Sequence, residues 1–301
     1  MTSPNDKRKY LKPEIVSILS SMALRARLIV EGYIIGNHRS PYHGFSVEFA
    51  EHKSYDIGDE VRHIDWKLYG KTDRLYIKRY EEETNLKTHI ILDNSKSMSY
   101  SSGSVSKLSF ANSLTAALAY LMINQQDAVG LIQFSDKINT LLPPKSKKSH
   151  LSSILGKLND NVQGQDTLVE PVLHEIAERI NKRGLVILIS DLLDDPGRVM
   201  NGLKHFRHKR QEVIVFHLID RKELEFDFSK RTKFIDMETG EEINTEPWHI
   251  QSSYKELVLK TQNLYKKECR QQLIDYIPVF TDQSLEQCIT GYLNKRKKIF
   301  N

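Results

Sequence analysis

The sequence predicts an α/β fold with a doubly wound, mostly parallel sheet, and two observations support this prediction. Short apolar runs recur in the second part of the chain, and each ends at a polar or charged residue. Between them lie longer segments whose apolar residues repeat at helical spacing. Fully buried strands that alternate with helices are typical of a parallel sheet covered by helices on both faces. With 301 residues, 39% of them hydrophobic, the chain can bury such a core.

The regular alternation begins after Thr84 and defines the expected elements in order. Strands are expected at Leu86–Leu92, Ala128–Phe134, Gly184–Ser190, Val213–Leu218 and Tyr276–Phe280, with a short partner at Ile138–Leu142. Helices are expected at Ser106–Gln125, His150–Leu158, Leu168–Lys182, Pro196–His208, Ser252–Ile274 and Ser284–Lys295. A hairpin-like segment at Phe234–Ile243 interrupts the alternation.

The first part of the chain has a different pattern. Apolar residues at helical spacing predict a helix from Pro13 to about Glu31. The following stretch to Glu83 is rich in Gly, Tyr, His and charge, and alternating segments such as Leu75–Tyr80 favour strands. We therefore expect two domains: residues 1–83, a helix with a small β-rich module, and residues 84–301, the α/β domain. Trp66 is expected to be a packing residue, either in a core or between the two modules.

Composition and charge exclude several classes of protein. The 44 Lys and Arg exceed the 39 Asp and Glu by a net charge of only +5. Three basic clusters near predicted helix ends are explained by solvation and the helix dipole, so no nucleic-acid binding is expected. No apolar run approaches the roughly 20 residues of a membrane span, and no signal peptide is recognised. The two cysteines, Cys269 and Cys288, have no partners at metal spacing, so a reducing cytoplasm is expected.

Oxygen-bearing side chains follow two predicted strands. Asp93 opens the segment Asp-Asn-Ser-Lys-Ser, in which Ser95 and Ser97 follow at alternate positions, and Asp191 comes directly after Gly184–Ser190. Thr167 lies in a polar loop between them in sequence. Ligands of doubly wound sheets bind beyond the carboxyl ends of the strands. Carboxylates and hydroxyls without a soft ligand suit a hard cation, so we predict a Mg²⁺ site, with Mn²⁺ or Ca²⁺ as alternatives.

This set of residues resembles the metal-ion-dependent adhesion site of von Willebrand factor A domains. The resemblance rests on Asp93, Ser95 and Ser97, together with Thr167 and Asp191. Leu168 follows Thr167 where that family often has a small polar or acidic residue, so either Thr167 or the neighbouring Asp166 is the loop ligand. The resemblance implies a metal site that accepts a carboxylate from another protein.

Further motifs resemble the signature of the bacterial domain-of-unknown-function family 58. They are Gly44–Phe49, Tyr55–Trp66, Leu75–Glu83 and Gly184–Pro196. This resemblance covers most of the chain. It implies cooperation with a MoxR-type AAA ATPase in chaperone-like complex assembly or metal insertion.

Enzymatic alternatives have weaker support in the sequence. A Mg²⁺-dependent phosphatase of the haloacid-dehalogenase type needs a second Asp two residues after the nucleophile, where this chain has Ser95. Neither a phosphate-binding Gly-x-x-x-x-Gly-Lys-Ser/Thr loop nor a Gly-x-Ser-x-Gly elbow occurs. The sequence therefore predicts a non-enzymatic, protein-binding adaptor, with a Mg²⁺-dependent phosphatase or other hydrolase as the alternative.

Overall fold

The computed structural model describes residues 47–56, 64–82, 87–124, 126–160, 169–228, 232–235, 240, 242–285 and 288–289. The chain divides into two compact units, one spanning residues 37–85 and the other comprising residues 1–36 and 86–301. The helix predicted at Pro13–Glu31 lies outside the described residues, as does most of the one predicted at Ser284–Lys295.

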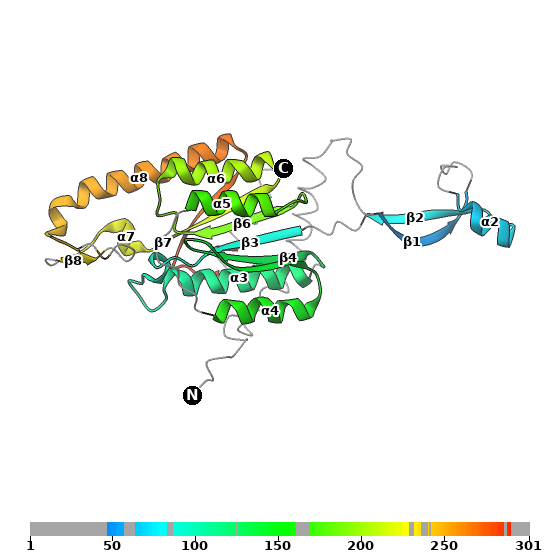
Figure 1. The fold of residues 1–301 in the computed structure, drawn as a ribbon, viewed down its shortest axis with the longest axis horizontal. Helices are drawn as coiled ribbons and strands as arrows, with labels where there is room; N and C mark the ends of the chain where they lie inside the picture. The colour runs from blue at the N-terminus through cyan, green and yellow to red at the C-terminus, as the bar shows by residue number, and fades with distance from the viewer. Residues whose placement is uncertain are drawn as a thin grey trace, which may run out of the picture. The chain divides into compact units, whose positions relative to one another are not determined.

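The larger unit is built on a six-stranded sheet with the order β10-β7-β6-β3-β4-β5 (Figure 1). Its strands are β3 (Lys87–Asp93), β4 (Ala128–Phe134), β5 (Ile138–Lys145), β6 (Leu185–Ser190), β7 (Glu212–Ile219) and β10 (Asp275–Phe280). All neighbours pair in parallel except β4 and β5, which are antiparallel. The prediction of a mostly parallel α/β sheet is therefore confirmed. β5 contains two prolines and lies at the edge of the sheet, which is where strands tolerate proline.

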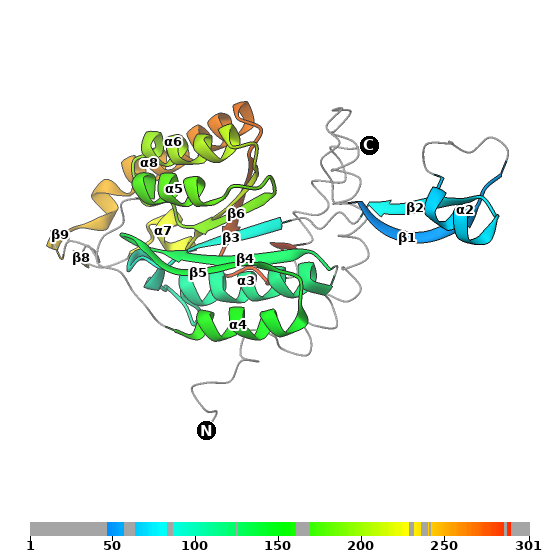
Figure 2. The same ribbon diagram turned by 45° about the vertical axis from the view of Figure 1, so that its right-hand side comes forward.

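Helices cover both faces of this sheet. α3 (Lys107–Asn124) and α4 (Lys148–Asn159) lie on one face. α5 (Val169–Arg179), α6 (Pro196–His208) and α8 (Pro247–Gln271) lie on the other, as Figures 1 and 2 show. The predicted bounds of α6 are reproduced, whereas α8 begins at Pro247, before the expected Ser252. Proline is favoured in a first helical turn because its missing N–H would have no helical partner there.

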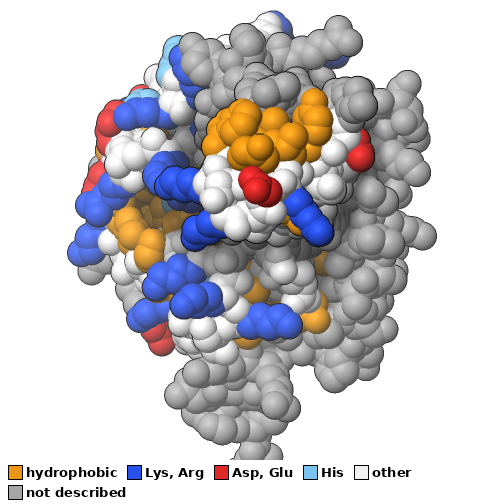
Figure 3. Space-filling model, turned by 90° about the vertical axis from the view of Figure 1, so that its right-hand side faces the viewer, with side chains coloured by type: hydrophobic (Ala, Val, Ile, Leu, Met, Phe, Trp, Pro, Cys, Tyr) orange, Lys and Arg blue, Asp and Glu red, His pale blue; other side chains and the backbone are white. Residues whose placement is uncertain are grey.

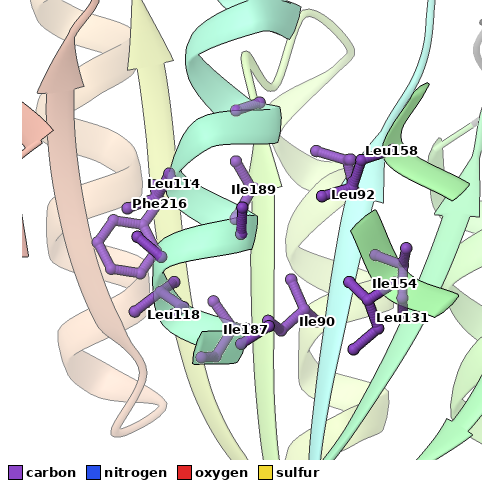
Figure 4. Packing of buried hydrophobic residues seen from close by; sticks show 14 of the residues in the cluster. Ile90, Leu92, Leu114, Leu118, Leu131, Ile154, Leu158, Ile187, Ile189 and Phe216 are labelled. Atoms are coloured by element: carbon purple, nitrogen blue, oxygen red, sulfur yellow. The ribbon is translucent and has the colours of Figure 1, made fainter. Parts of the chain in front are cut away.

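Two hydrophobic clusters fill the space between the sheet and its helices. Ile90 and Leu92 of β3 belong to the first cluster, where they meet Leu114 and Leu118 of α3 (Figure 4). Ile91 between them belongs to the second cluster, with the apolar residues of α5, α6 and α8. Successive side chains of a strand point to opposite faces, so a continuous apolar run supplies both clusters. This explains why the inner strands read as uninterrupted runs in the sequence.

Smaller elements complete this unit. A 3₁₀ turn, η2 (Ser97–Ser99), follows β3, and a hairpin joins β8 (Thr232–Ile235) to β9 (Glu242–Thr245). The short helix α7 (Arg221–Glu225) was not predicted; Asp220 caps it by accepting a hydrogen bond from the backbone N–H of Lys222. Cys269 and Cys288 are free and buried, as expected of ordinary core thiols. No helix among the described residues is both long and apolar enough to cross a bilayer.

The smaller unit contains the antiparallel pair β1 (Val47–Ser54) and β2 (Tyr76–Glu82), and the helix α2 (Trp66–Thr72). Asp65 caps α2 by accepting hydrogen bonds from two backbone N–H groups. Trp66 is not a core residue of this unit, because its side chain is 60% exposed at the start of a helix that buries none of its residues. Trp66 and Tyr69 instead meet edge to face on the surface. Figure 3 views the molecule from the right-hand side of Figure 1. Hydrophobic side chains are grouped on this face, next to Lys and Arg side chains.

Candidate metal centre

The two acids singled out from the sequence lie at the same edge of the sheet. Asp93 is the last residue of β3, and Asp191 directly follows β6. These strands are parallel neighbours, with Leu92 opposite Ile189, so their carboxyl ends meet. Both side chains are almost fully buried, Asp93 at 1% and Asp191 at 4% exposure. The topology therefore brings together two carboxylates that lie far apart in the chain.

Neutral groups hold the Asp93 carboxylate in place. Its Oδ1 accepts a hydrogen bond from the backbone N–H of Ser95 at 2.9 Å, and its Oδ2 accepts one from the Ser190 hydroxyl at 2.6 Å. Burial, followed by the charge of Asp191, raises the pKa of Asp93 to about 7. The hydrogen bonds from Ser95 and Ser190 favour the ionised form, but both donors are neutral. A cation is the species that would compensate this carboxylate.

Ser95 and Ser97 present their hydroxyls to one another beside Asp93. Their Oγ atoms lie 2.9 Å apart. Ser95 is buried and Ser97 is half-buried at the start of η2. Met98, the next residue, is completely buried in the first hydrophobic cluster and anchors the turn to the core. The structure thus brings Asp93, Ser95 and Ser97 together, as expected for alternate positions after a strand.

Asp191 has an ionic partner that sequence reasoning missed. The Nζ of Lys107, the first residue of α3, lies 2.7 Å from Asp191 Oδ2 and 2.9 Å from Glu223 Oε1 of α7. The Lys107 side chain is fully buried. Burial alone lowers the pKa of Lys107, but the two carboxylates outweigh it and raise the pKa above its usual value. One signal was present in the sequence: a cation in the first turn of a helix opposes the helix dipole unless anions surround it.

A second layer of hydrogen bonds fixes the backbone around Asp191. His217 of β7 lies with its Nε2 2.9 Å from the Asp191 carbonyl oxygen and its Nδ1 2.6 Å from the Tyr276 hydroxyl. Because the carbonyl can only accept, Nε2 donates and Nδ1 accepts from Tyr276. Burial lowers the pKa of His217 to about 4, so the imidazole is neutral, in agreement with these roles. Tyr265 of α8 donates to the carbonyl of Leu192, the next residue.

The predicted loop ligand, Thr167 or Asp166, lies outside the described residues, which omit 161–168. The first described residue after this gap is Val169, at the start of α5. Its backbone N–H donates a hydrogen bond to Asp194 Oδ2 at 3.2 Å. The start of α5 is therefore attached to the loop that contains Asp191.

The chemistry of the described donors fits a hard divalent cation. Within the described ranges no group of three or more His, Cys, Asp or Glu side chains is arranged to hold a metal, so hydroxyls and water would have to supply part of any coordination shell. The cluster contains three carboxylates, the buried Asp93 and Asp191 and the partly exposed Glu223, and one buried ammonium, Lys107. With these four groups ionised their net charge is −2, and the buried Asp220 adds a further negative charge on the side of Glu223. Oxygen ligands with several coordinated waters are typical of Mg²⁺.

Fold and site together define an α/β protein with a carboxylate and hydroxyl cluster at the carboxyl end of its parallel strands. The family described as "Protein of unknown function DUF58" matches residues 51–263, which is more than half of the chain. The chain belongs to this family.

Relatives and solved structures extend this comparison. An uncharacterised protein of Mycobacterium tuberculosis is 22% identical over 231 residues, which cover 76% of this chain and 72% of that protein. Solved structures with a similar fold include BatB from Bacteroides thetaiotaomicron, with 18% identity, a TM-score of 0.45, and coverage of 71% of this chain and 99% of that one. The SpRpn10 VWA domain shows 11% identity, a TM-score of 0.39, and coverage of 69% and 95%. At these identities and TM-scores the likeness gives no information on function.

Proposed function

We propose that this chain is a non-enzymatic adaptor that binds a partner protein through a Mg²⁺ ion. The hydroxyls of Ser95 and Ser97 would hold the ion directly, and Asp93, Asp191 and Thr167 directly or through water. The observation that supports this most is the pair of hydroxyls 2.9 Å apart beside a buried carboxylate whose hydrogen-bond donors among the described residues are neutral. Mn²⁺ or Ca²⁺ would suit the same oxygen donors.

The mixture of ligands favours binding over catalysis. Serine hydroxyls are neutral, so they leave more positive charge on the ion than carboxylates would. An ion in this state attracts a further anionic ligand, and a carboxylate of another protein has the required chemistry. In this role Mg²⁺ supplies the positive charge that a partner's acidic side chain recognises.

Exposed apolar side chains beside the cluster support a protein as the partner. Leu193, two residues after Asp191, is 61% exposed, and Val105, two residues before Lys107, is 40% exposed. In protein interfaces the contacts that surround a central anchoring residue exclude water from it, and exposed apolar side chains can supply such contacts. A partner that presents an acidic residue flanked by apolar ones fits these features.

For the identity of the partner, the support is the resemblance of the signature motifs, together with membership of the DUF58 family. It implies a MoxR-type AAA ATPase or its client, and a role in chaperone-like complex assembly or metal insertion. Position 95 supports the non-enzymatic assignment, because serine there cannot act as the second acid of a phosphatase.

Calorimetry with Mn²⁺ and Mg²⁺ on the wild type and on Asp93→Asn tests the metal site. We expect the wild type to bind both ions. The metal affinity of Asp93→Asn should fall by more than roughly 10–100-fold, the loss that is typical of a residue which only orients a ligand. Removing Asp93 also relieves repulsion by Asp191, so the variant's stability without metal should not fall. Absence of binding to the wild type would overturn the proposed site.

Capture of a purified MoxR-type ATPase by the wild type, with Mg²⁺ and with a chelator, tests the adaptor function. Asp93→Asn should capture no more than the chelated wild type. The same proteins are assayed with generic phosphatase and esterase substrates. Metal-dependent turnover that disappears in Asp93→Asn, without metal-dependent capture, would replace the adaptor by the hydrolase alternative.

A further inference from the structure

The buried Lys107 has no role in the proposed coordination shell, yet it lies at the centre of the cluster. Its ammonium is shared by Asp191 at 2.7 Å and Glu223 at 2.9 Å, and its side chain is fully buried. A buried ammonium is costly unless it is paired and hydrogen-bonded, and removing one partner of such a group is strongly destabilising. The Lys107 ammonium is therefore stabilised by two carboxylates, and it lies next to the site proposed for the metal ion.

The second carboxylate is supplied by a well-anchored element. Glu223 lies on α7, whose cap Asp220 accepts a hydrogen bond from the N–H of Lys222 at 2.8 Å. The other oxygen of Asp220 accepts one from the N–H of Ser102, at 3.1 Å, in the loop that leads to Lys107. α7 and the start of α3 are thus joined both at the cap and at the ion pair. Glu223 has a fixed place in the cluster despite being partly exposed.

Removing any one charged group of this cluster changes the net charge of the cluster by one unit. The three carboxylates and Lys107 give −2; without Lys107 the same carboxylates give −3, and without Glu223 the remainder gives −1. Because Lys107, Asp93 and Asp191 are buried and Glu223 is mostly so, these differences are screened less than those between charges on the surface. A cation that enters the site experiences the sum of these charges.

We propose that Lys107 is a positioning and specificity residue of the metal site: it holds Asp191 and, with Glu223, sets the cluster's charge so that a divalent ion is selected. This inference rests on the proposed metal site and adds the basis of its cation selectivity. Lys107 acts through Asp191 and through its charge, and it does not itself bind the ion.

Competition between Mn²⁺ and Tb³⁺ on the full chain tests the inference, because the two ions share a preference for oxygen ligands but differ in charge. In Lys107→Met the ratio of Tb³⁺ to Mn²⁺ affinity should rise about tenfold or more, since each added negative charge favours the trivalent ion more strongly. In Glu223→Gln the ratio should fall by a similar factor. The double variant Lys107→Met/Glu223→Gln restores the charge of −2 and should return the ratio towards that of the wild type.

Lys107→Arg provides the matched control, because it keeps the positive charge and the ability to pair with both carboxylates. Its ratio should stay within a few-fold of the wild type, even if its geometry lowers both affinities. A purely structural role for Lys107 would change stability and both affinities together and leave the ratio unchanged in every variant. That result would overturn the inference.

The inference and the proposed site fail in different ways. If the wild type binds neither ion, the site itself is wrong. If the wild type binds Mn²⁺ and the ratio does not follow the charge of the cluster, the site stands and the role of Lys107 is wrong. Should Lys107→Met not fold, the double variant and Glu223→Gln still decide the question, because neither leaves an unpaired ammonium.

Discussion

The two ends of the parallel sheet differ in the paired charges that they bury. At the amino end of β3, partial burial and the neighbouring Lys182 lower the pKa of Lys87. Burial, followed by the charge of Lys87, lowers the pKa of His89 to about 4. At the carboxyl end, Lys107 is held as an ammonium between two carboxylates, and Asp93 is surrounded by hydrogen-bond donors.

This difference indicates which end is organised for a ligand. A structural edge of a sheet avoids buried charge, as the neutral His89 does, because desolvating an ion is expensive. The carboxyl end instead accumulates buried charge and supplies specific partners for it. Such an arrangement is typical of functional sites. Four substitutions, two at each end, test whether the contrast is real.

The largest effect is expected at the carboxyl end, for Asp191→Asn. This variant removes one carboxylate from the fully buried Lys107 and leaves it with Glu223 alone. Breaking a buried ion pair in this way costs about 3–5 kcal/mol. Urea unfolding should therefore show a midpoint far below that of the wild type.

Lys157→Met is the control for this variant. It breaks an ion pair with Asp160 whose side chains are about half exposed, at 47% and 52%. Its cost should stay below about 1 kcal/mol. Equal costs for the two variants would show that the buried network contributes no more than a surface pair.

At the amino end the largest effect is steric, for Gly184→Ala. A Cβ at this position would lie 2.1 Å from the carbonyl oxygen of Lys87, so the backbones of two neighbouring strands would have to separate. We expect a loss of about 3 kcal/mol, at the upper end of overpacking effects. Thermal unfolding checks this value. Gly156→Ala on α4 meets nothing within 4 Å and should instead stabilise the protein by about 0.5–1 kcal/mol.

A smaller effect is expected from acid, through His89. Its pKa is 6.5 in the unfolded chain and about 4 in the fold, so between these pH values the unfolded state binds more protons. The unfolding free energy should therefore decrease as the pH falls from 6.5 to 4, and His89 should contribute nothing above that window. Unfolding titrations at several pH values should show a shallower decline for His89→Gln. His208→Gln, at an exposed site on α6, serves as control and should keep the wild-type slope.

The smallest effect on the fold is expected for Ser97→Ala. This hydroxyl is half-buried and forms a hydrogen bond with the Ser95 hydroxyl. Its loss should leave the unfolding midpoint unchanged within error and lower Mn²⁺ affinity by about tenfold or more, since even residues that only orient a ligand contribute about that much. Ser152→Ala, exposed on α4, should change neither quantity. An unchanged Mn²⁺ affinity in Ser97→Ala would remove Ser97 from the proposed ligands.

Much of this edge could be predicted from local patterns. The apolar runs before Asp93 and Asp191 have to be buried strands, and parallel strands place their carboxyl ends together. The alternation of Asp93, Ser95 and Ser97 then predicted that their side chains meet, which the hydrogen bonds among them show. The helix α7 escaped prediction because five residues are too few for a periodic pattern.

The sequence by itself determined the α/β alternation, the mostly parallel sheet, and the placement of Asp93 and Asp191 at its carboxyl edge, because these follow from hydrophobic periodicity and chain direction. Only the tertiary structure decided which charges meet there. Asp191 lies 84 positions after Lys107 in the chain, and Glu223 lies 116 positions after it, so no local pattern relates the three residues. Trp66 shows the same limit, since an aromatic residue is buried only where another element covers it. Long-range ion pairs and burial depend on packing between elements, which no local pattern in the sequence encodes.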